Sequence, residues 1–265
     1  MHFTYVFDLD GVIYRGSELQ PDAKETVARL RSSGEGVFFL TNNSTISRQQ
    51  YVEKLAAMGI ETKPEDFMTS AYATALYLAE QGGSGKKACV VGGQGIVTEL
   101  AAVGIETISE GQADYVVVGL DRQFTYEKLA RAQNAILNGA IFIATNTDAT
   151  FPQEGGIIRP GAGSIVAAVA TASGVMPIVM GKPEILSARL QMAAAGTTPE
   201  RTIMIGDRLD TDILAAKRVG AEAVLVLGGI NDREDAANAP PEMRPDRIIE
   251  RLGELIETCS DDSRV

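Results

Sequence analysis

Two carboxylates near the N-terminus are the first side chains whose types and spacing suggest chemistry. Asp8 and Asp10 lie two residues apart, directly after an apolar run at residues 5–7 that we predict as a buried strand. Side chains two residues apart in an extended chain point the same way, so both carboxylates can face one pocket. Gly11 permits the turn that follows. Calcium loops and ordinary turns contain the same pattern, so the segment alone leaves both chemistry and a plain turn open.

Short polar side chains follow a second predicted strand, at residues 36–40. Thr41, Asn42 and Asn43 stand just before a predicted helix at residues 47–58. Hydroxyls, amides and free backbone N–H groups at such a junction suit the oxygens of a phosphate group. The other interpretation is a cluster that caps the helix, which is common wherever a strand leads into a helix.

A lysine follows a third predicted strand, at residues 178–180. Lys182 lies between a glycine and a proline, which is unusual for a solvated lysine. It can neutralise an anion and orient a carboxylate. A surface lysine in a loop is the competing interpretation.

Three acidic residues crowd the turn after a fourth predicted strand, at residues 202–205. Asp207 ends this strand, Asp210 follows, and Asp212 begins a predicted helix at residues 212–219. Carboxylate oxygens with an open coordination shell suit Mg²⁺, which keeps several of its waters. Asp210 or Asp212 can instead act as a simple helix cap.

The elements that must position these side chains alternate along almost the whole 265-residue chain. Apolar strand-like runs alternate with patterns of helical period, which implies right-handed crossovers and a parallel sheet, so we predict an α/β fold. In open parallel sheets ligands bind at the carboxyl ends of the strands, where all four segments lie. The remaining predicted helices cover residues 21–31, 95–102, 126–138, 163–173 and 184–195, and the remaining strands cover residues 88–91, 115–118, 141–144 and 223–227.

A glycine-rich stretch at residues 82–85 is the best candidate for a linker by composition. It follows the first two strand–helix units. This position suggests that a middle block is inserted into an outer domain built from both ends of the chain.

Three glycines at residues 92–95, between a strand and a helix, suggest a dinucleotide loop at first sight. Their spacing does not fit the dinucleotide pattern, and no acidic residue marks a ribose site at the expected distance. We therefore expect no nucleotide cofactor.

The acidic composition of the chain limits its partners. The formal net charge is −11 and the isoelectric point is about 4.7. Nucleic acids and anionic membranes select basic surfaces, so we expect neither as a partner. No stretch of about 20 apolar residues predicts a membrane span. An anionic substrate would need local positive charge against this overall field.

The two cysteines, Cys89 and Cys259, form neither a disulfide framework nor a metal-ligand spacing. The N-terminus lacks the basic region, apolar core and cleavage site of a signal peptide. We therefore expect a reduced, cytoplasmic compartment.

Taken together and in this order, the four segments resemble the four motifs of the haloacid dehalogenase superfamily, and the resemblance covers nearly the whole chain. Residues 41–44, 181–183 and 206–212 look like the branch that contains para-nitrophenyl phosphatase, phosphoglycolate phosphatase and pyridoxal phosphatase. Recurring segments of that branch's large C2-type (NagD-like) cap are matched at residues 90–95, 145–148 and 160–164.

The resemblance implies a division into two domains. A Rossmann-like parallel-sheet catalytic core is expected at residues 1–78 and 180–265, and an inserted α/β cap domain at residues 79–179. Members of this branch often pair through the cap, so a homodimer is an expectation.

The resemblance also implies a magnesium-dependent phosphatase that hydrolyses small-molecule phosphate monoesters. Asp8 is expected to attack phosphorus and form an aspartyl-phosphate, and Asp10 to protonate the leaving alcohol and then deprotonate water. The expected Mg²⁺ ligands are a carboxylate oxygen of Asp8, the backbone carbonyl of Asp10 and a carboxylate oxygen of Asp207. Asp212 is expected to hold a metal-bound water.

Four residues are expected to bind the phosphoryl oxygens: Thr41, the backbone at Asn42, Asn43 and Lys182. An anionic nucleophile cannot approach an anionic phosphate unaided. Mg²⁺ and Lys182 would supply the positive charge that the chain lacks overall.

The matching specificity segment of the cap runs over residues 148–155. Phe151 stands where pyridoxal phosphatases look to have a histidine, so pyridoxal phosphate is a less expected substrate. Phe151 can pack on an apolar part of the leaving group or belong to the cap core. Phosphoglycolate, sugar phosphates and nucleoside monophosphates all stay open as substrates.

Four other functions compete with this one. A phosphotransferase or mutase of the superfamily uses the same nucleophile, but mutases usually carry a small helical cap early in the chain, whereas the insertion here follows Asn43. A dehalogenase needs neither the second carboxylate, Asp10, nor Mg²⁺. Receiver domains also place acids and a lysine at strand ends but are much shorter. A non-catalytic phosphometabolite-binding protein would be expected to lose Asp8, Asp10 or Asp207, and all three are present.

Overall fold

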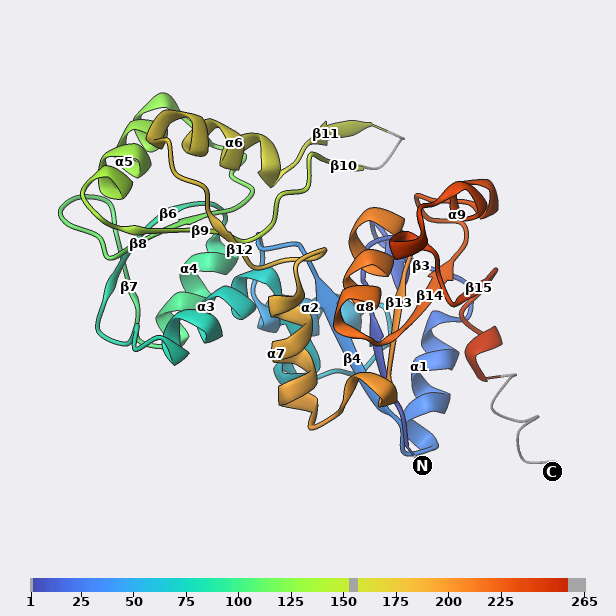
Figure 1. Ribbon diagram of the computed structural model, residues 1–265. Helices are drawn as coiled ribbons and strands as arrows, with labels where there is room; N and C mark the ends of the chain where they lie inside the picture. The colour runs from blue at the N-terminus through green and yellow to red at the C-terminus, as the bar shows by residue number, and fades with distance from the viewer. Residues whose placement is uncertain (1, 153–156, 257–265) are drawn as a thin grey trace. The chain divides into compact units, whose positions relative to one another are not determined.

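The structure is a computed structural model that describes residues 2–152 and 157–256 (Figure 1). The chain divides into two compact units, each described here by itself. Their segments are Met1–Thr41, Val52–Met68 and Lys182–Val265 for the first unit, and Asn42–Tyr51 and Thr69–Gly181 for the second.

Some sequence-based expectations are not tested by this division. The bounds predicted for the core and the cap, between residues 78 and 79 and between residues 179 and 180, stay a prediction. Cys259 and residues 153–155 of the specificity segment lie outside the described residues.

A six-stranded sheet forms the centre of the first unit. Its strand order is β15-β14-β13-β1-β4-β5, and the strand pairs from β15 to β4 are parallel. Strands β1 and β13 are buried along their whole length, as expected for parallel strands covered on both faces. The predicted α/β class is confirmed. The strands are β1 (Thr4–Phe7), β4 (Gly36–Thr41), β5 (Phe67–Thr69), β13 (Thr202–Gly206), β14 (Glu222–Val226) and β15 (Arg247–Ile249).

Helices cover both faces of this sheet. Helix α1 packs against β4 on one face, whereas α7 and α8 pack together on the other face (Figure 1). A short antiparallel hairpin, β2 and β3, follows β1. The elements are β2 (Tyr14–Arg15), β3 (Glu18–Leu19), α1 (Ala23–Ser32), α7 (Ile185–Ala195), α8 (Leu214–Val219) and α9 (Arg233–Asn238); α2 (Arg48–Ala57) has residues in both units.

The helix predicted at residues 212–219 begins earlier than expected. A π-helical turn at Leu209–Ile213 precedes α8, so Asp212 lies inside the helical segment. The Arg208 N–H donates to the Asp212 carboxylate at 3.1 Å, across this wide turn. The prediction that Asp212 begins the helix was therefore wrong, because the chain turns into the helix one wide turn sooner.

A second parallel sheet, of five strands in the order β12-β9-β8-β6-β7, forms the centre of the second unit. Helices α5 and α6 pack together over one face, with Val116, Val118 and Val169 in the shared core, and α3 and α4 pack on the opposite face (Figure 1). The strands are β6 (Lys87–Val91), β7 (Glu106–Ile108), β8 (Tyr115–Val118), β9 (Ile141–Ala144) and β12 (Ile178–Val179), and the helices are α3 (Ser70–Glu80), α4 (Gln94–Ala102), α5 (Tyr126–Leu137) and α6 (Ala162–Ser173).

Two connections of the second unit bear on the sequence predictions. The glycine-rich stretch at residues 82–85 joins α3 to β6, both in this unit, and the Gly85 N–H donates to the Gly104 carbonyl at 2.8 Å. The stretch is therefore a turn within the second unit. An antiparallel hairpin, β10 (Thr150–Pro152) and β11 (Ile158–Pro160), precedes α6. Among the described helices none combines the length and the apolar character that crossing a membrane requires.

Candidate active site

Three of the predicted segments meet at one edge of the first unit's sheet. Asp8 follows β1, Thr41 ends β4 and Asp207 follows β13, and β1 lies between β4 and β13. The Asp8 N–H donates to the carbonyl of Ile205 in β13 at 2.8 Å. The strand order therefore brings residues from both ends of the chain to the carboxyl edge of the sheet, where parallel sheets bind their ligands.

Lys182 lies at the centre of this group. Its side chain is buried, with the residue 3% exposed. The ammonium nitrogen lies 2.7 Å from Asp8 Oδ1, 2.6 Å from Asp212 Oδ1 and 2.9 Å from the Leu40 carbonyl oxygen. An ammonium has three N–H donors, and three oxygens surround this one. Lys182 is therefore not the surface lysine of the competing interpretation, and it positions the Asp8 carboxylate.

The Asp207 carboxylate is held by a loop at residues 228–231. Its Oδ2 atom accepts a hydrogen bond from the Ile230 N–H at 3.0 Å. The Asn231 N–H donates to the Asp207 carbonyl at 3.1 Å, and the Asn231 side-chain oxygen accepts from the Leu209 N–H at 2.9 Å. The loop thus fixes both the backbone and one carboxylate oxygen of Asp207.

Two glycines let the backbone approach Asp207 closely. A Cβ atom on Gly11 would lie 2.3 Å from Asp207 Oδ2, and one on Gly229 would lie 2.2 Å from the same atom. Gly11 also has a positive φ of 92°, which side chains other than glycine rarely adopt. Both positions therefore require glycine if Asp207 is to keep its place.

The acidic side chains form a compact cluster. Oxygens of Asp8, Asp207 and Asp212 all lie within 4.8 Å of one another. Burial raises the pKa of Asp8 well above its usual range, and the charges of Asp212 and Asp207 add to this although Lys182 opposes it. Burial together with the Asp212 charge raises the pKa of Asp207 to about 7. Burial alone would lower the pKa of Lys182, but Asp212 and Asp8 outweigh it and raise the pKa.

This donor set fits a hard divalent cation. The cluster carries more carboxylates than the single ammonium of Lys182 can neutralise, and carboxylate oxygens are the ligands that Mg²⁺ prefers. A bound cation would favour the charged carboxylates and so reverse the upward pKa shifts of Asp8 and Asp207.

Asp10 lies beside a tyrosine and a lysine that the sequence did not single out. The Tyr14 hydroxyl donates to Asp10 Oδ2 at 3.4 Å, and the Lys54 ammonium lies 3.5 Å from the centroid of the Tyr14 ring. Asp10 keeps exposed surface. Desolvation of its carboxylate by the surrounding protein still raises the pKa of Asp10, against the charge of Lys54 and the hydrogen bond from Tyr14. The short spacing from Asp10 to Tyr14 is visible in the sequence, but nothing there points to Lys54.

Asn42 and Asn43 belong to the second unit. The Asn42 side-chain amide donates to both carboxylate oxygens of Asp148, at 3.0 and 3.2 Å. The Asn43 side-chain oxygen accepts from the N–H and the hydroxyl of Thr45, at 2.9 and 2.7 Å. Both side chains thus have partners within their own unit, ahead of α2.

Phe151 also belongs to the second unit, where it lies on β10. It is half-buried, and the guanidinium carbon of Arg122 lies 5.7 Å from the centroid of its ring. Phe151 is paired with Arg159 across the β10–β11 hairpin. A half-buried ring with one cationic side chain over it is compatible with both interpretations made for Phe151 from the sequence.

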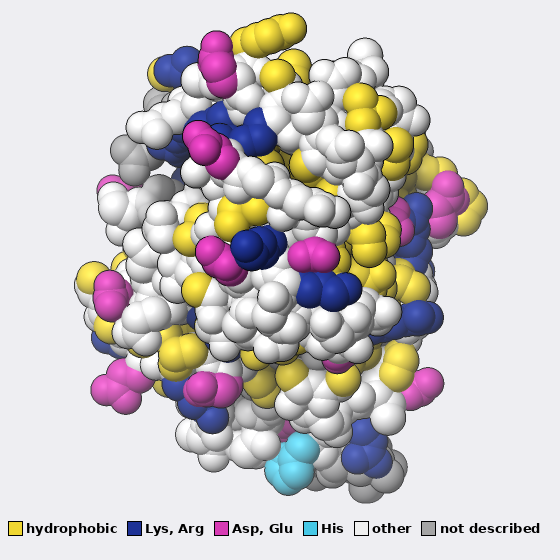
Figure 2. Space-filling model, turned by 90° about the vertical axis from the view of Figure 1, so that its left-hand side faces the viewer, with side chains coloured by type: hydrophobic (Ala, Val, Ile, Leu, Met, Phe, Trp, Pro, Cys, Tyr) yellow, Lys and Arg dark blue, Asp and Glu magenta, His cyan; other side chains and the backbone are white. Residues whose placement is uncertain are grey.

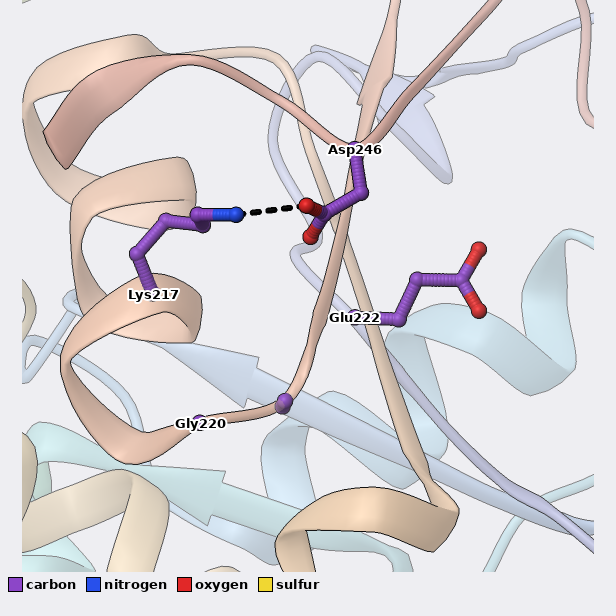
Figure 3. Close-up of a pocket in the computed structure, with 5 residues that line it drawn as sticks. Lys217, Gly220, Glu222 and Asp246 are labelled. Carbon is purple, nitrogen blue, oxygen red and sulfur yellow. Dashed lines mark hydrogen bonds and ion pairs between the residues drawn. The ribbon is translucent and has the colours of Figure 1, made fainter. Parts of the chain in front are cut away.

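Two further charged features of the first unit lie outside the acidic cluster. Asp210 pairs with the Arg208 guanidinium on the surface, at 3.1 and 2.9 Å. Figure 3 shows a pocket that contains none of the predicted site residues. There the Lys217 ammonium pairs with Asp246, whose other oxygen accepts from the Ala223 N–H at 2.8 Å. Lys217 and Asp246 of this pocket thus already pair with each other.

A parallel sheet with a buried lysine–carboxylate cluster at its carboxyl edge defines the candidate active site of an α/β enzyme, and comparisons with known proteins give the family. The model of the "Haloacid dehalogenase-like hydrolase" family matches residues 5–106, and a HAD-hydrolase-like model matches residues 179–255. An acid sugar phosphatase from Staphylococcus aureus is 39% identical over 254 residues, which cover 95% of this chain and 97% of that protein.

Solved structures agree with this similarity. The p-nitrophenyl phosphatase from Archaeoglobus fulgidus superposes with a TM-score of 0.90 at 33% identity, covering 97% of this chain and 99% of that one. A glycerol phosphate phosphatase from Mycobacterium tuberculosis, solved in complex with magnesium, has a TM-score of 0.88 at 35% identity, covering 96% of this chain and 76% of that one. The chain belongs to the haloacid dehalogenase-like hydrolases, among the phosphatases of that family, and the resemblance seen in its motifs is confirmed.

Proposed function

We propose that this protein is a magnesium-dependent phosphatase that hydrolyses small-molecule phosphate monoesters with Asp8 as the nucleophile. The observation that carries the proposal is the Lys182 ammonium between Asp8 and Asp212 at the sheet edge. The lysine holds one Asp8 oxygen, so the other can be aimed at phosphorus. Relatives over almost the full length of the chain that are named as phosphatases support the same chemistry.

The proposed reaction has two steps. In the first, a carboxylate oxygen of Asp8 attacks phosphorus, the ester P–O bond breaks, and Asp10 gives its proton to the leaving oxygen. In the second, Asp10 takes a proton from water, the water oxygen attacks phosphorus, and the P–O bond to Asp8 breaks. The raised pKa of Asp10 supports the first role, because it favours the protonated form that a general acid needs.

Mg²⁺ is the proposed cofactor. Carboxylate oxygens of Asp8 and Asp207 and the backbone carbonyl of Asp10 would hold it. Asp212 is proposed to act through a metal-bound water, since its two oxygens already accept from Lys182 at 2.6 Å and from the Arg208 N–H at 3.1 Å. The cation would neutralise charge on the phosphoryl group and on the attacking carboxylate.

The other residues that the sequence analysis singled out are proposed to bind substrate. Thr41, the backbone at Asn42, Asn43 and Lys182 would bind phosphoryl oxygens, and Phe151 would contact the leaving group. The bonds of Asn42 to Asp148 and of Asn43 to Thr45 support a fixed conformation for this stretch. The second unit would then serve as the cap domain.

The proposed substrate is a small phosphorylated metabolite. Sugar phosphates are favoured among the open candidates because a relative is named an acid sugar phosphatase. On the face that Figure 2 draws, Lys and Arg side chains alternate with Asp and Glu rather than forming one continuous basic surface, which fits a small ligand better than a nucleic acid. We further propose a cytoplasmic location, for which the free thiol of Cys89 is suitable, and a homodimer through the cap.

Hydrolysis of p-nitrophenyl phosphate tests the phosphatase proposal directly. Release of p-nitrophenolate should require Mg²⁺ and should stop when the metal is chelated. Release that continues at the same rate in excess chelator would contradict the metal dependence. No release under any metal condition would contradict the phosphatase activity itself and would favour a binding role.

A further inference from the structure

The environment of Asp10 contains a half-buried cation that the proposed reaction does not use. Lys54, on α2, places its ammonium 3.5 Å from the centroid of the Tyr14 ring. Tyr14 is fully buried, at 0% exposed. A lysine normally keeps its ammonium in water, so the half-buried position of Lys54 over this ring suggests a specific role.

The Tyr14 ring is itself fixed with respect to Asp10. The backbone between them turns back on itself: the Gly11 N–H donates to the Tyr14 carbonyl at 2.8 Å, and the Tyr14 N–H donates to the Leu9 carbonyl at 3.2 Å. Asp10 and Tyr14 form an isolated β-bridge. This turn brings the Tyr14 hydroxyl back to Asp10 Oδ2, which it approaches to 3.4 Å.

We propose that Tyr14 and Lys54 are positioning residues for Asp10. The Tyr14 hydroxyl donates to Oδ2 of Asp10 and keeps its own proton, so that Oδ1 is the oxygen that faces the leaving group. Lys54 holds the ring in place through the attraction between its charge and the ring face, and draws electron density away from the hydroxyl, which strengthens the hydroxyl as a donor. This inference rests on the phosphatase proposal, because it gives Asp10 the same proton-transfer step.

The inference predicts an effect that depends on the leaving group. A good leaving group such as p-nitrophenolate departs without a proton, whereas phenolate from phenyl phosphate relies on the proton from Asp10. Each variant is compared with the wild type on the same substrate, so a fixed difference in binding between the two substrates cancels. The quantity to compare is kcat/KM, which covers the steps up to departure of the leaving group and excludes the later attack by water.

The test compares Tyr14→Phe with the wild-type protein on both substrates. Tyr14→Phe keeps the ring and removes the hydroxyl, so kcat/KM for phenyl phosphate should fall about tenfold more than kcat/KM for p-nitrophenyl phosphate, a fraction of the whole general-acid effect of about 100-fold or more. Lys54→Met should lower the ratio of kcat/KM for phenyl phosphate to kcat/KM for p-nitrophenyl phosphate in the same direction. Lys54→Arg keeps the cation, so its ratio should lie close to that of the wild type. Matched controls are Tyr126→Phe, at an exposed tyrosine, and Lys24→Met, at an exposed lysine of α1.

The outcomes separate the two proposals. An equal loss on both substrates, or no loss in either variant, overturns the positioning role while leaving the phosphatase proposal in place. A wild-type protein inactive on both substrates overturns both. Thermal unfolding of each variant shows whether it folds. If Tyr14→Phe does not fold, the positioning role is tested by comparing the ratio of the two kcat/KM values in Lys54→Met with that in Lys54→Arg.

Discussion

Replacing Lys182 with Met should destabilise the protein strongly in the absence of a divalent cation. The change removes an ammonium that lies 2.7 Å from Asp8 and 2.6 Å from Asp212. Met is similar in length and fills the space, so the main loss is charge compensation. Two carboxylates in a buried setting then have no lysine partner.

The size of the effect follows from burial. The side chain of Lys182 is 4% exposed, and those of Asp8 and Asp212 are 13% and 6% exposed. Breaking a buried ion pair by removing one partner costs about 3–5 kcal/mol, because the remaining charge stays uncompensated. Lys217 gives a matched control, since its ion pair with Asp246 is largely on the surface, at 32% and 42% exposed. Lys217→Met should cost only about 0–1 kcal/mol.

The loss of stability in Lys182→Met should also depend on pH, and it should grow as the pH rises. Burial raises the pKa of Asp8 even with the lysine present, and without Lys182 the carboxylates would bind protons more tightly still. The folded variant then holds more protons than the unfolded chain, so its stability falls as the pH rises. The difference in unfolding free energy between variant and wild type should be larger at pH 8 than at pH 5.

Chemical denaturation of the metal-free proteins at these two pH values measures the effect. A loss in Lys182→Met no greater than that in Lys217→Met would refute the reasoning. A loss of the same size at pH 5 and pH 8 would refute the role assigned to the carboxylates.

Two more predictions concern the metal and the cap. Since the pKa of Asp207 rises from an ordinary 3.8 to about 7, the metal-free protein should lose stability as the pH rises through that range, on the order of 4 kcal/mol at most. Mg²⁺ should restore stability at pH 8, and Asp207→Asn should reduce both effects without removing them, because the pKa of Asp8 is raised as well. Unfolding curves at pH 8 that are the same with and without Mg²⁺ would contradict this. Phe151→His should change the order of preference across a panel of phosphorylated metabolites, and an unchanged order would favour a purely structural role for Phe151.

Much of the fold was predictable because its strands are buried on both faces. The runs at residues 115–118 and 141–144 are continuous apolar segments, and the structure gives strands with the same bounds. Short elements with weak patterns were missed, among them β5 at Phe67–Thr69 and β15 at Arg247–Ile249. Their pairing in the sheet stabilises them more than their own residue types do.

The candidate site also contains residues that the sequence predicts and residues that it does not. Asp8, Lys182 and Asp207 were predictable because each follows a recognisable strand. Lys54 was not, because its contact with Tyr14 joins segments forty residues apart and leaves no local pattern in the sequence. The π-helical turn at Leu209–Ile213 was also missed; in the structure the Asp212 carboxylate accepts from the Arg208 N–H across this turn.

The central claim is that Asp8 carries the phosphoryl group during turnover, and mass spectrometry of acid-quenched enzyme tests it most directly. With p-nitrophenyl phosphate and Mg²⁺, the wild-type peptide that contains Asp8 should gain the mass of one phosphoryl group. Asp8→Asn should show neither this adduct nor turnover above background. A phosphoryl group found on another residue, or wild-type turnover in Asp8→Asn, would contradict the account.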